Sequence, residues 1–172
     1  VSPKAVPALA DANEVLAGIR RAPGVVYVAL VPNVRGVQNA AATASRPDEV
    51  NGVMSASETH NRANINRTHE QTLAELPMMV RVAHEAGIRL TMSLSTTFGC
   101  PFEGQVKEAA VLRFVEAFWA AGVDGISLAD TTGMANPRQV FDVCTRLAAA
   151  FPGVRWVLHL HNTRDMALAN IV

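Results

Sequence analysis

Two histidines spaced two residues apart are the strongest candidates for chemistry in this sequence. His159 and His161 end a β-branched run and continue into Asn162 and Thr163. On a β-strand, residues two apart face the same side, so both imidazoles can bind one metal ion. Two hydrogen-bonded histidines in a polar rim would give the same pattern. The spacing alone leaves both interpretations open.

A second candidate is segment 126–133, which reads Ile-Ser-Leu-Ala-Asp-Thr-Thr-Gly. Ser127, Asp130 and the hydroxyls of Thr131 and Thr132 could bind a substrate or transfer a proton. An Asp followed by Thr-Thr-Gly is also typical of a turn or a helix N-cap. Capping is therefore the alternative for Asp130.

Polar strings also follow two other apolar runs. Ser57-Glu58 and Asn64-Ile65-Asn66 could hold hydroxyls or carboxylates, although solvated loops carry the same residues. Segment 95–104 has the Gly and Pro content of a shaped loop over the strand ends. We expect Cys100 in this loop to pack as a small apolar residue, because no base motif accompanies it.

The three remaining histidines have no partner at the spacing of metal ligands. They are His60, His69 and His84, and they fall on loop and helix segments. We expect them to be surface or interface residues.

A framework of strands and helices has to bring these candidates together. The predicted strands are Val25–Val31, Glu49–Ala56, Ile88–Leu94, Gly125–Ala129 and Arg155–Leu160. Helical periodicity covers Ala5–Arg21, Thr68–Ala86, Ala109–Ala121 and a segment from Asp165 onwards, while Pro47-Asp48 and Asn61–Asn66 are predicted loops. Strict alternation of strand and helix requires parallel strands, in a doubly wound sheet or a closed barrel. In either fold, ligands bind at the carboxyl ends of the strands, where His159 and His161 fall.

Length and composition indicate one globular domain over residues 1–172, with 49% hydrophobic residues. Fifteen basic residues balance fifteen acidic ones, so no net charge draws the protein to nucleic acid or to an anionic membrane. Two cysteines are too few for a secreted disulfide framework, which favours a cytoplasmic location. Because helical segments stand at both ends of the predicted strand series, we expect both ends to be truncated.

Seven strings together resemble 3-hydroxy-3-methylglutaryl-CoA lyases, in the order found in that family. They are Val1-Ser2-Pro3-Lys4, Pro32-Asn33, Ser57-Glu58, Asn64-Ile65-Asn66, residues 99–104, residues 127–131 and residues 159–163. The resemblance implies a TIM-type (β/α)8 barrel that is incomplete here, with the five strands as its third to seventh and Val1–Lys4 finishing the second. The barrel is thereby favoured over the doubly wound sheet.

The same resemblance implies the roles of individual residues. The metal ligands would be His159 and His161, the cofactor Mg²⁺ or Mn²⁺, and the catalytic residues Asp130, Ser127 and His159. The substrate-binding residues would be Asn33, Glu58, Asn64, Asn66 and Ser95. The family's Arg-Asp-Gly motif would precede Val1, and its metal-binding Asn and catalytic Cys would follow Val172. Where animal enzymes have a Gly-Tyr pair, this sequence has Met92-Ser93, which leaves the acyl group open.

The implied activity is cleavage of 3-hydroxy-3-methylglutaryl-CoA, or a close 3-hydroxyacyl-CoA, to acetyl-CoA and acetoacetate or a related keto acid. This is a step of leucine degradation. The implied partner is an acyl-CoA substrate, in a homo-oligomer without nucleic acid or membrane. Two alternatives stay open: a condensing relative of the isopropylmalate or homocitrate synthase type, and an inactive fragment that acts only by association.

Overall fold

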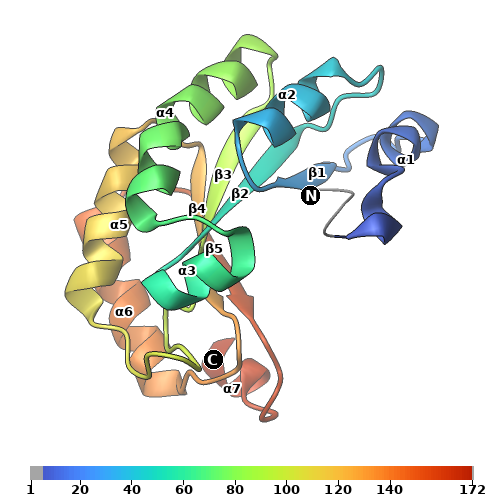
Figure 1. Ribbon diagram of the computed structural model, residues 1–172. Helices are drawn as coiled ribbons and strands as arrows, with labels where there is room; N and C mark the ends of the chain where they lie inside the picture. The colour runs from blue at the N-terminus through green and yellow to red at the C-terminus, as the bar shows by residue number, and fades with distance from the viewer. Residues whose placement is uncertain (1–5, 172) are drawn as a thin grey trace.

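The computed structural model describes residues 6–171 and contains one parallel sheet (Figure 1). Its five strands pair in the order of the sequence. They are β1 (Val28–Val31), β2 (Glu49–Ser55), β3 (Arg89–Ser95), β4 (Gly125–Asp130) and β5 (Trp156–Leu160). A doubly wound sheet would reverse its strand order, whereas consecutive barrel units keep it. The α/β class is confirmed, and the order is that of part of a barrel.

Helices occupy every connection between the strands. The long ones are α2 (Val34–Ala42), α4 (His69–Glu85), α5 (Glu108–Ala120) and α6 (Pro137–Ala150), and the short ones are α1 (Ala12–Gly18), α3 (Glu58–Ile65) and α7 (Ala167–Ile171). In Figure 1, α4, α5 and α6 lie along one side of the sheet. Across residues 6–171, none of these helices combines the length and the hydropathy needed to cross a membrane.

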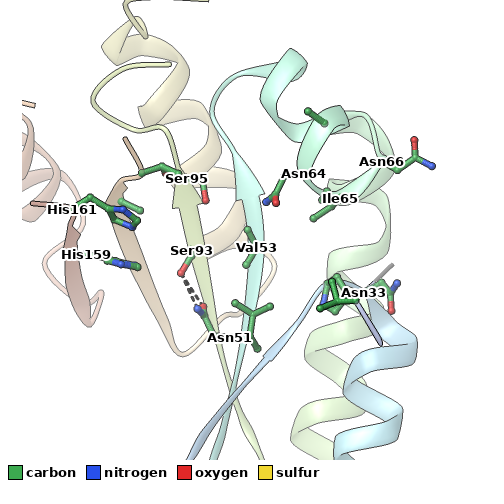
Figure 2. Close-up of a pocket in the computed structure, with 16 residues that line it drawn as sticks. Asn33, Asn51, Val53, Asn64, Ile65, Asn66, Ser93, Ser95, His159 and His161 are labelled. Carbon is green, nitrogen blue, oxygen red and sulfur yellow. Dashed lines mark hydrogen bonds between the residues drawn. The ribbon is translucent and has the colours of Figure 1, made fainter. Parts of the chain in front are cut away.

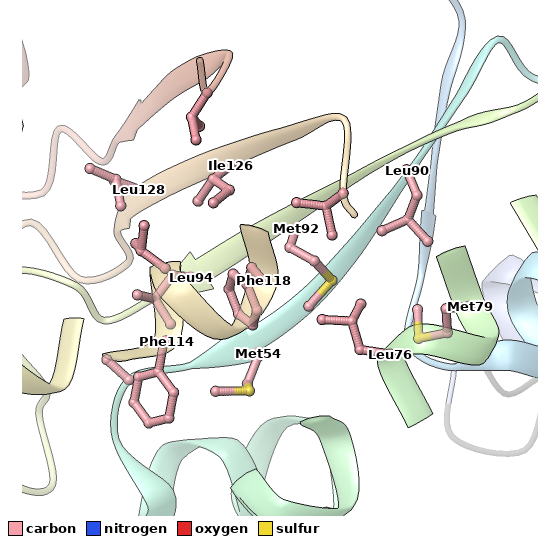
Figure 3. Packing of buried hydrophobic residues seen from close by; sticks show 14 of the residues in the cluster. Met54, Leu76, Met79, Leu90, Met92, Leu94, Phe114, Phe118, Ile126 and Leu128 are labelled. Atoms are coloured by element: carbon pink, nitrogen blue, oxygen red, sulfur yellow. The ribbon is translucent and has the colours of Figure 1, made fainter. Parts of the chain in front are cut away.

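The two faces of the sheet differ because side chains alternate along a strand. Even-numbered residues of β2, β3 and β4 pack toward the helices and are nearly all fully buried, as Figure 3 shows. They include Met54, Leu90, Met92, Leu94, Ile126 and Leu128, which join Phe114 and Phe118 of α5 in one hydrophobic cluster. The odd-numbered residues on the opposite face, which we call the inner face, are mostly polar.

A charged network joins β2, β3 and the residue before β5 at the amino-terminal end of the inner face. The hydroxyl of Thr91 donates to Glu49 Oε1 at 2.7 Å, and Arg155 Nη2 donates to Glu49 Oε2 at 2.6 Å. Arg155 also donates to the Thr91 hydroxyl at 2.7 Å. Burial would raise the pKa of Glu49, but the hydrogen bonds from Thr91 and Arg155 outweigh it, so the pKa lies below its ordinary value.

Arg155 reaches this network because Gly125 lies between it and Thr91 in the sheet. The register places Thr91 beside Gly125, and Ile126 beside Trp156. A Cβ atom at position 125 would stand 3.0 Å from the Arg155 carbonyl oxygen and 3.1 Å from its Nε. The missing side chain therefore leaves the space that the Arg155 side chain crosses.

The predicted elements differ from the observed ones at the first strand, the first helix and the loop Asn61–Asn66. The first strand begins at Val28 and not at Val25, because its partner strand begins at Glu49 and the ladder starts with the pair Val28–Glu49. The predicted helix Ala5–Arg21 is a 3-10 turn (Pro7–Leu9) followed by α1. The strand expected to end in Val1–Lys4 lies outside the described residues.

The predicted loop Asn61–Asn66 is mostly helical, which corrects the sequence analysis. The side chain of Ser57 accepts from the backbone N–H of His60 at 3.0 Å and caps the start of α3. Asn66 ends the helix in the left-handed conformation, with φ of 54°. Asparagine tolerates this conformation at a helix C-terminus. One of the asparagines that suggested a loop, Asn66, is therefore the C-cap of α3.

We predict that Glu49→Gln destabilises the full-length protein containing this chain by about 1–3 kcal/mol at pH 7, because a buried charged hydrogen-bond acceptor is lost. Since the folded-state pKa of Glu49 is lowered, its contribution is present above the ordinary carboxyl pKa and is lost as pH falls through the folded value. The difference between the two proteins should therefore shrink in acid. Urea unfolding from pH 7 to pH 3 measures it, with the exposed Glu116→Gln as control. A pH-independent difference would contradict the assignment.

Residues 1–172 expressed alone are predicted to self-associate. Among the described strands, β1 and β5 each pair on one side only, and Val28 and Leu30 on the inner face are 54% and 55% exposed. Unpaired strand edges and exposed apolar side chains favour association between chains. Size-exclusion chromatography with light scattering should show oligomers that Leu30→Lys reduces. Phe141→Lys, which changes an exposed residue of α6, is the control. A monomeric wild-type chain would contradict this prediction.

Candidate active site

A cavity of about 830 Å³ opens at the carboxyl-terminal end of the inner face. Figure 2 shows the two histidines of β5 on one side of it and three asparagines on the other. The wall between them comes from β2, β3 and β4, through Asn51, Val53, Ser93, Ser95 and Ala129. The cavity therefore collects polar side chains that lie far apart in the sequence.

His159 and His161 lie next to each other at the end of β5. Their ring centroids are 4.8 Å apart, with an angle of 32° between the ring planes, and both rings line the cavity. This arrangement fits two neighbouring ligand positions around one metal ion. Within residues 6–171, no group of three or more His, Cys, Asp or Glu side chains could hold a metal ion. The pair can therefore supply two nitrogen ligands, and a role as ligands stays a prediction.

Hydroxyl and amide groups form the floor of the cavity. The side-chain amide of Asn51 and the hydroxyl of Ser93 are hydrogen-bonded at 2.9 Å. Ser95, two residues further along β3, also lines the cavity. Ser127 lines an adjoining hollow of the inner face together with His159. These groups can bind carboxylate, carbonyl or hydroxyl oxygens of a ligand.

The rim opposite the histidines comes from two helix termini. Asn33 caps α2, since its Oδ1 accepts from the backbone N–H of Gly36 at 3.0 Å. Asn64 lies in the last turn of α3, and Asn66 is its C-cap. All three side chains belong to residues that line the cavity. Of the five predicted substrate-binding residues, the structure thus brings four together: Asn33, Asn64, Asn66 and Ser95.

Glu58 does not line this cavity. Its carboxylate accepts from the backbone N–H of His69 at 2.8 Å and from Arg62 Nε at 3.1 Å. These contacts join the start of α4 to α3. The substrate-binding role expected for Glu58 stays a prediction, and the geometry favours a structural role.

Asp130 has its side chain on the helix side of β4. The carboxylate is fully buried and accepts from the backbone N–H groups of Met134, at 2.8 Å, and Ala135, at 3.1 Å. Ala129 and Thr131, its neighbours in the chain, line the cavity instead. The proton-transfer role expected for Asp130 stays a prediction, and the geometry favours the alternative in which it caps a turn.

The loop after β3 begins with a strained residue. Thr96 is buried and has φ of 55°, a left-handed conformation that costs a β-branched residue about 1–3 kcal/mol. Its backbone N–H donates to the Thr131 hydroxyl at 2.8 Å, and its own hydroxyl accepts from Ser57 N at 3.3 Å. The strained turn therefore joins three strand ends around the cavity. Cys100 in the same loop is fully buried, in agreement with the packing role expected for it.

Two histidines expected at the surface or at an interface are half-buried beside Ser55, the last residue of β2. His60 Nδ1 lies 2.7 Å from the Ser55 hydroxyl, and His69 Nε2 lies 2.7 Å from the Ser55 carbonyl oxygen. Burial lowers the pKa of His60, which favours its neutral form. Both rings thus help to fix the connection between β2 and α3.

Asn51 and Ser93 were not among the site residues predicted from the sequence, although both line the cavity wall. A signal was present, because polar residues recur at every second position of β2 and β3, as in Glu49-x-Asn51 and Thr91-x-Ser93-x-Ser95. Such alternation inside a strand whose other face is apolar marks a polar face within a fold.

Comparison with known proteins shows the family to which the chain is similar along its length. A family model described as HMGL-like matches residues 4–172. Hydroxymethylglutaryl-CoA lyase YngG of Bacillus subtilis is 46% identical over 172 residues, which are 100% of this chain and 57% of that protein. The crystal structure of the Bacillus subtilis HMG-CoA lyase superposes with a TM-score of 0.93 at 46% identity, covering 99% of this chain and 57% of that one.

A second solved structure is an HMG-CoA lyase from Acinetobacter baumannii in complex with coenzyme A and 3-methylmalate. It superposes with a TM-score of 0.92 at 40% identity, covering 99% of this chain and 55% of that one. The chain thus spans about half the length of the proteins it matches. The (β/α)8 barrel expected from the sequence is confirmed as the fold to which these five strands belong.

We predict that Asp130→Asn lowers the stability of the full-length protein by about 1–2 kcal/mol, because one amide oxygen replaces two carboxylate oxygens facing two N–H groups. Thermal unfolding measures the change, with Asp11→Asn as control, since Asp11 is exposed and makes no side-chain cap hydrogen bond. Unchanged stability together with a large loss of kcat would instead support proton transfer by Asp130.

Proposed function

The chain belongs to the HMGL-like family, and we propose that the full-length protein containing it is a divalent-metal-dependent carbon–carbon lyase. Its substrate would be 3-hydroxy-3-methylglutaryl-CoA or a close 3-hydroxyacyl-CoA. In the reaction the hydroxyl proton leaves, the bond between the hydroxyl-bearing carbon and the carbon beside the thioester breaks, and the resulting acetyl-CoA enolate takes up a proton. The products are acetyl-CoA and acetoacetate, or a related keto acid, as in leucine degradation.

The observation that carries this proposal is the histidine pair at the edge of a cavity lined with hydroxyl and amide groups. A retro-Claisen reaction needs an electrophile that holds the hydroxyl and carbonyl oxygens together, and a site that binds the remaining acid group. A bound Mg²⁺ or Mn²⁺ would lower the pKa of the hydroxyl and stabilise the enolate. These cations prefer oxygen ligands, so His159 and His161 would form only part of the coordination.

The other residues of the cavity would bind and orient the acyl group. Ser95, Ser127 and the Asn51–Ser93 pair offer hydrogen-bond donors on the floor beside the histidines. Asn33, Asn64 and Asn66 stand further out, at the rim, where the thioester and its long carrier chain would pass. The Acinetobacter relative binds coenzyme A and a methyl-substituted dicarboxylic acid, which supports an acyl-CoA as the ligand.

Two of the catalytic residues that the family resemblance implies, Asp130 and His159, are candidates for accepting the hydroxyl proton. The Asp130 carboxylate is occupied by two backbone N–H groups, whereas His159 lies in the cavity wall. A ring nitrogen of His159 that binds the metal ion could not also accept this proton, so the ligand role and the acceptor role of His159 exclude each other. We also propose a homo-oligomer in the cytoplasm, where the free thiols of Cys100 and Cys144 are compatible with reducing conditions.

The alternative is a condensing enzyme, which would form the corresponding carbon–carbon bond from acetyl-CoA and a keto acid. No particular residue of the cavity favours condensation over cleavage. An assay that separates the two supplies either 3-hydroxy-3-methylglutaryl-CoA or acetyl-CoA with a keto acid to the full-length protein. Release of acetyl-CoA from the first substrate is the expected result. Turnover of only the second pair would replace the proposal by a synthase.

We predict that His159→Ala and His161→Ala each abolish cleavage and weaken Mn²⁺ binding at least tenfold, since each variant removes one of the imidazole ligands. Calorimetric titration of the folded full-length variants measures the affinity. His84→Ala is the matched control, because His84 pairs with Asp124 away from the cavity. Wild-type affinity in either cavity variant would remove that histidine from the metal site.

A further inference from the structure

The backbone at His161 is held less firmly by the sheet than that of His159. The ladder between β4 and β5 ends with the pair Asp130–Leu160, one residue before His161. Beyond it, His161 keeps one backbone contact to β4, from its N–H to the Asp130 carbonyl oxygen at 3.3 Å. The orientation of the His161 ring therefore depends on the residues that follow it.

Those residues form a compact turn that presents Arg164 to the neighbouring loop. The amide of Asn162 donates to Asp165 Oδ1 at 3.1 Å, and its oxygen accepts from the backbone N–H of Ala167 at the same distance. Asp165 has φ of 57° in this turn. Arg164 Nε then donates to the Gly133 carbonyl oxygen at 2.6 Å, and its Nη2 donates to the Ala135 carbonyl oxygen at 3.1 Å.

Arg164 and Asp130 both form hydrogen bonds to the backbone of residues 133–135. The Asp130 carboxylate binds the N–H groups of Met134 and Ala135, while the Arg164 guanidinium binds the carbonyl groups of Gly133 and Ala135. Asp130 also accepts from His161 through its own carbonyl group. His161 is thus linked to residues 133–135 in two ways. One link runs through Asp130, and the other runs through Arg164, three residues further along the chain.

Gly133 allows the loop after β4 to lie close to the turn after β5, so that Arg164 can reach the backbone carbonyl groups of the loop. It has φ of +69°, and a Cβ atom there would lie 2.8 Å from Thr163 Cβ. Real Cβ atoms do not come so close, so a side chain at position 133 would push residue 163 away. Residues 163 and 164 are therefore both fixed against the loop after β4, Thr163 by packing on Gly133 and Arg164 by hydrogen bonds.

We propose that Arg164 is a positioning residue for the metal-binding end of β5, an inference that rests on the proposed function. It acts through the loop of residues 133–135 and holds the His161 imidazole where it can share a metal ion with His159. Partners that orient metal ligands from outside the coordination sphere typically change metal affinity 10- to 100-fold when they are removed. A positively charged group beside a cation site would by itself weaken cation binding, so any loss of affinity on removing Arg164 has to come from lost orientation.

The test measures Mn²⁺ affinity by calorimetry in the folded full-length protein. Arg164→Met keeps the aliphatic stem and removes every donor, and we expect about a tenfold rise in the Mn²⁺ dissociation constant. Arg164→Lys keeps the charge and can reach one carbonyl group at a time, and it should fall between wild type and Arg164→Met. Arg138→Met is the matched control, because Arg138 is an exposed residue of α6 that pairs with Asp142 in its own helix.

The outcomes separate this inference from the proposed function. Wild-type affinity in Arg164→Met, with weakened binding in His161→Ala, would overturn the role of Arg164 and leave the metal site standing. Wild-type affinity in His161→Ala would overturn the metal site and the inference together. Should Arg164→Met fail to fold, Arg164→Lys decides, and wild-type affinity in that variant overturns the proposal.

Discussion

The structure depends on the alternation of side chains along five parallel strands held in one register. Each strand has to give one face to the helices and the other to the interior of the barrel, because successive side chains point in opposite directions. Leu90, Met92 and Leu94 of β3 therefore alternate with Thr91, Ser93 and Ser95. A slip of one residue would bury the hydroxyl groups against the helices and expose the leucines. The apolar core thus also determines where the polar cavity lies.

The kind of polar side chain on the inner face changes from the amino-terminal to the carboxyl-terminal end of the strands. Glu49 and Arg155 form an ion pair at the amino-terminal end, Asn51 and Ser93 form a neutral pair above it, and the histidines stand at the carboxyl-terminal end. The charged groups bind one another, whereas the residues at the carboxyl-terminal end line the cavity that is proposed to bind the substrate. Parallel barrels commonly divide stability and function between their two ends in this way.

Much of this arrangement could be predicted from local sequence, since periodicity and turn residues lie within a few positions of each other. The strands and the histidine pair are of this kind. The direction of the Asp130 carboxylate depended on N–H groups four and five residues later in a turn whose shape the sequence does not give. Glu58 was bound by His69 of the next helix, and the asparagines of 61–66 proved to be helical because Ser57 and Asn66 cap both ends. The positions of these side chains depend on contacts with residues outside the short patterns that can be read from the sequence.

The close approach of Gly125 and Arg155 implies that the two positions are not free to evolve separately. A methyl group at 125 would meet the backbone of residue 155 as well as its guanidinium, so even alanine would displace the strand edge and loosen the grip on Glu49. A lineage that lost Arg155 would leave the Glu49 carboxylate to Arg89 and Thr91, which is a weaker set of partners. We therefore expect Glu49, Gly125 and Arg155 to change together.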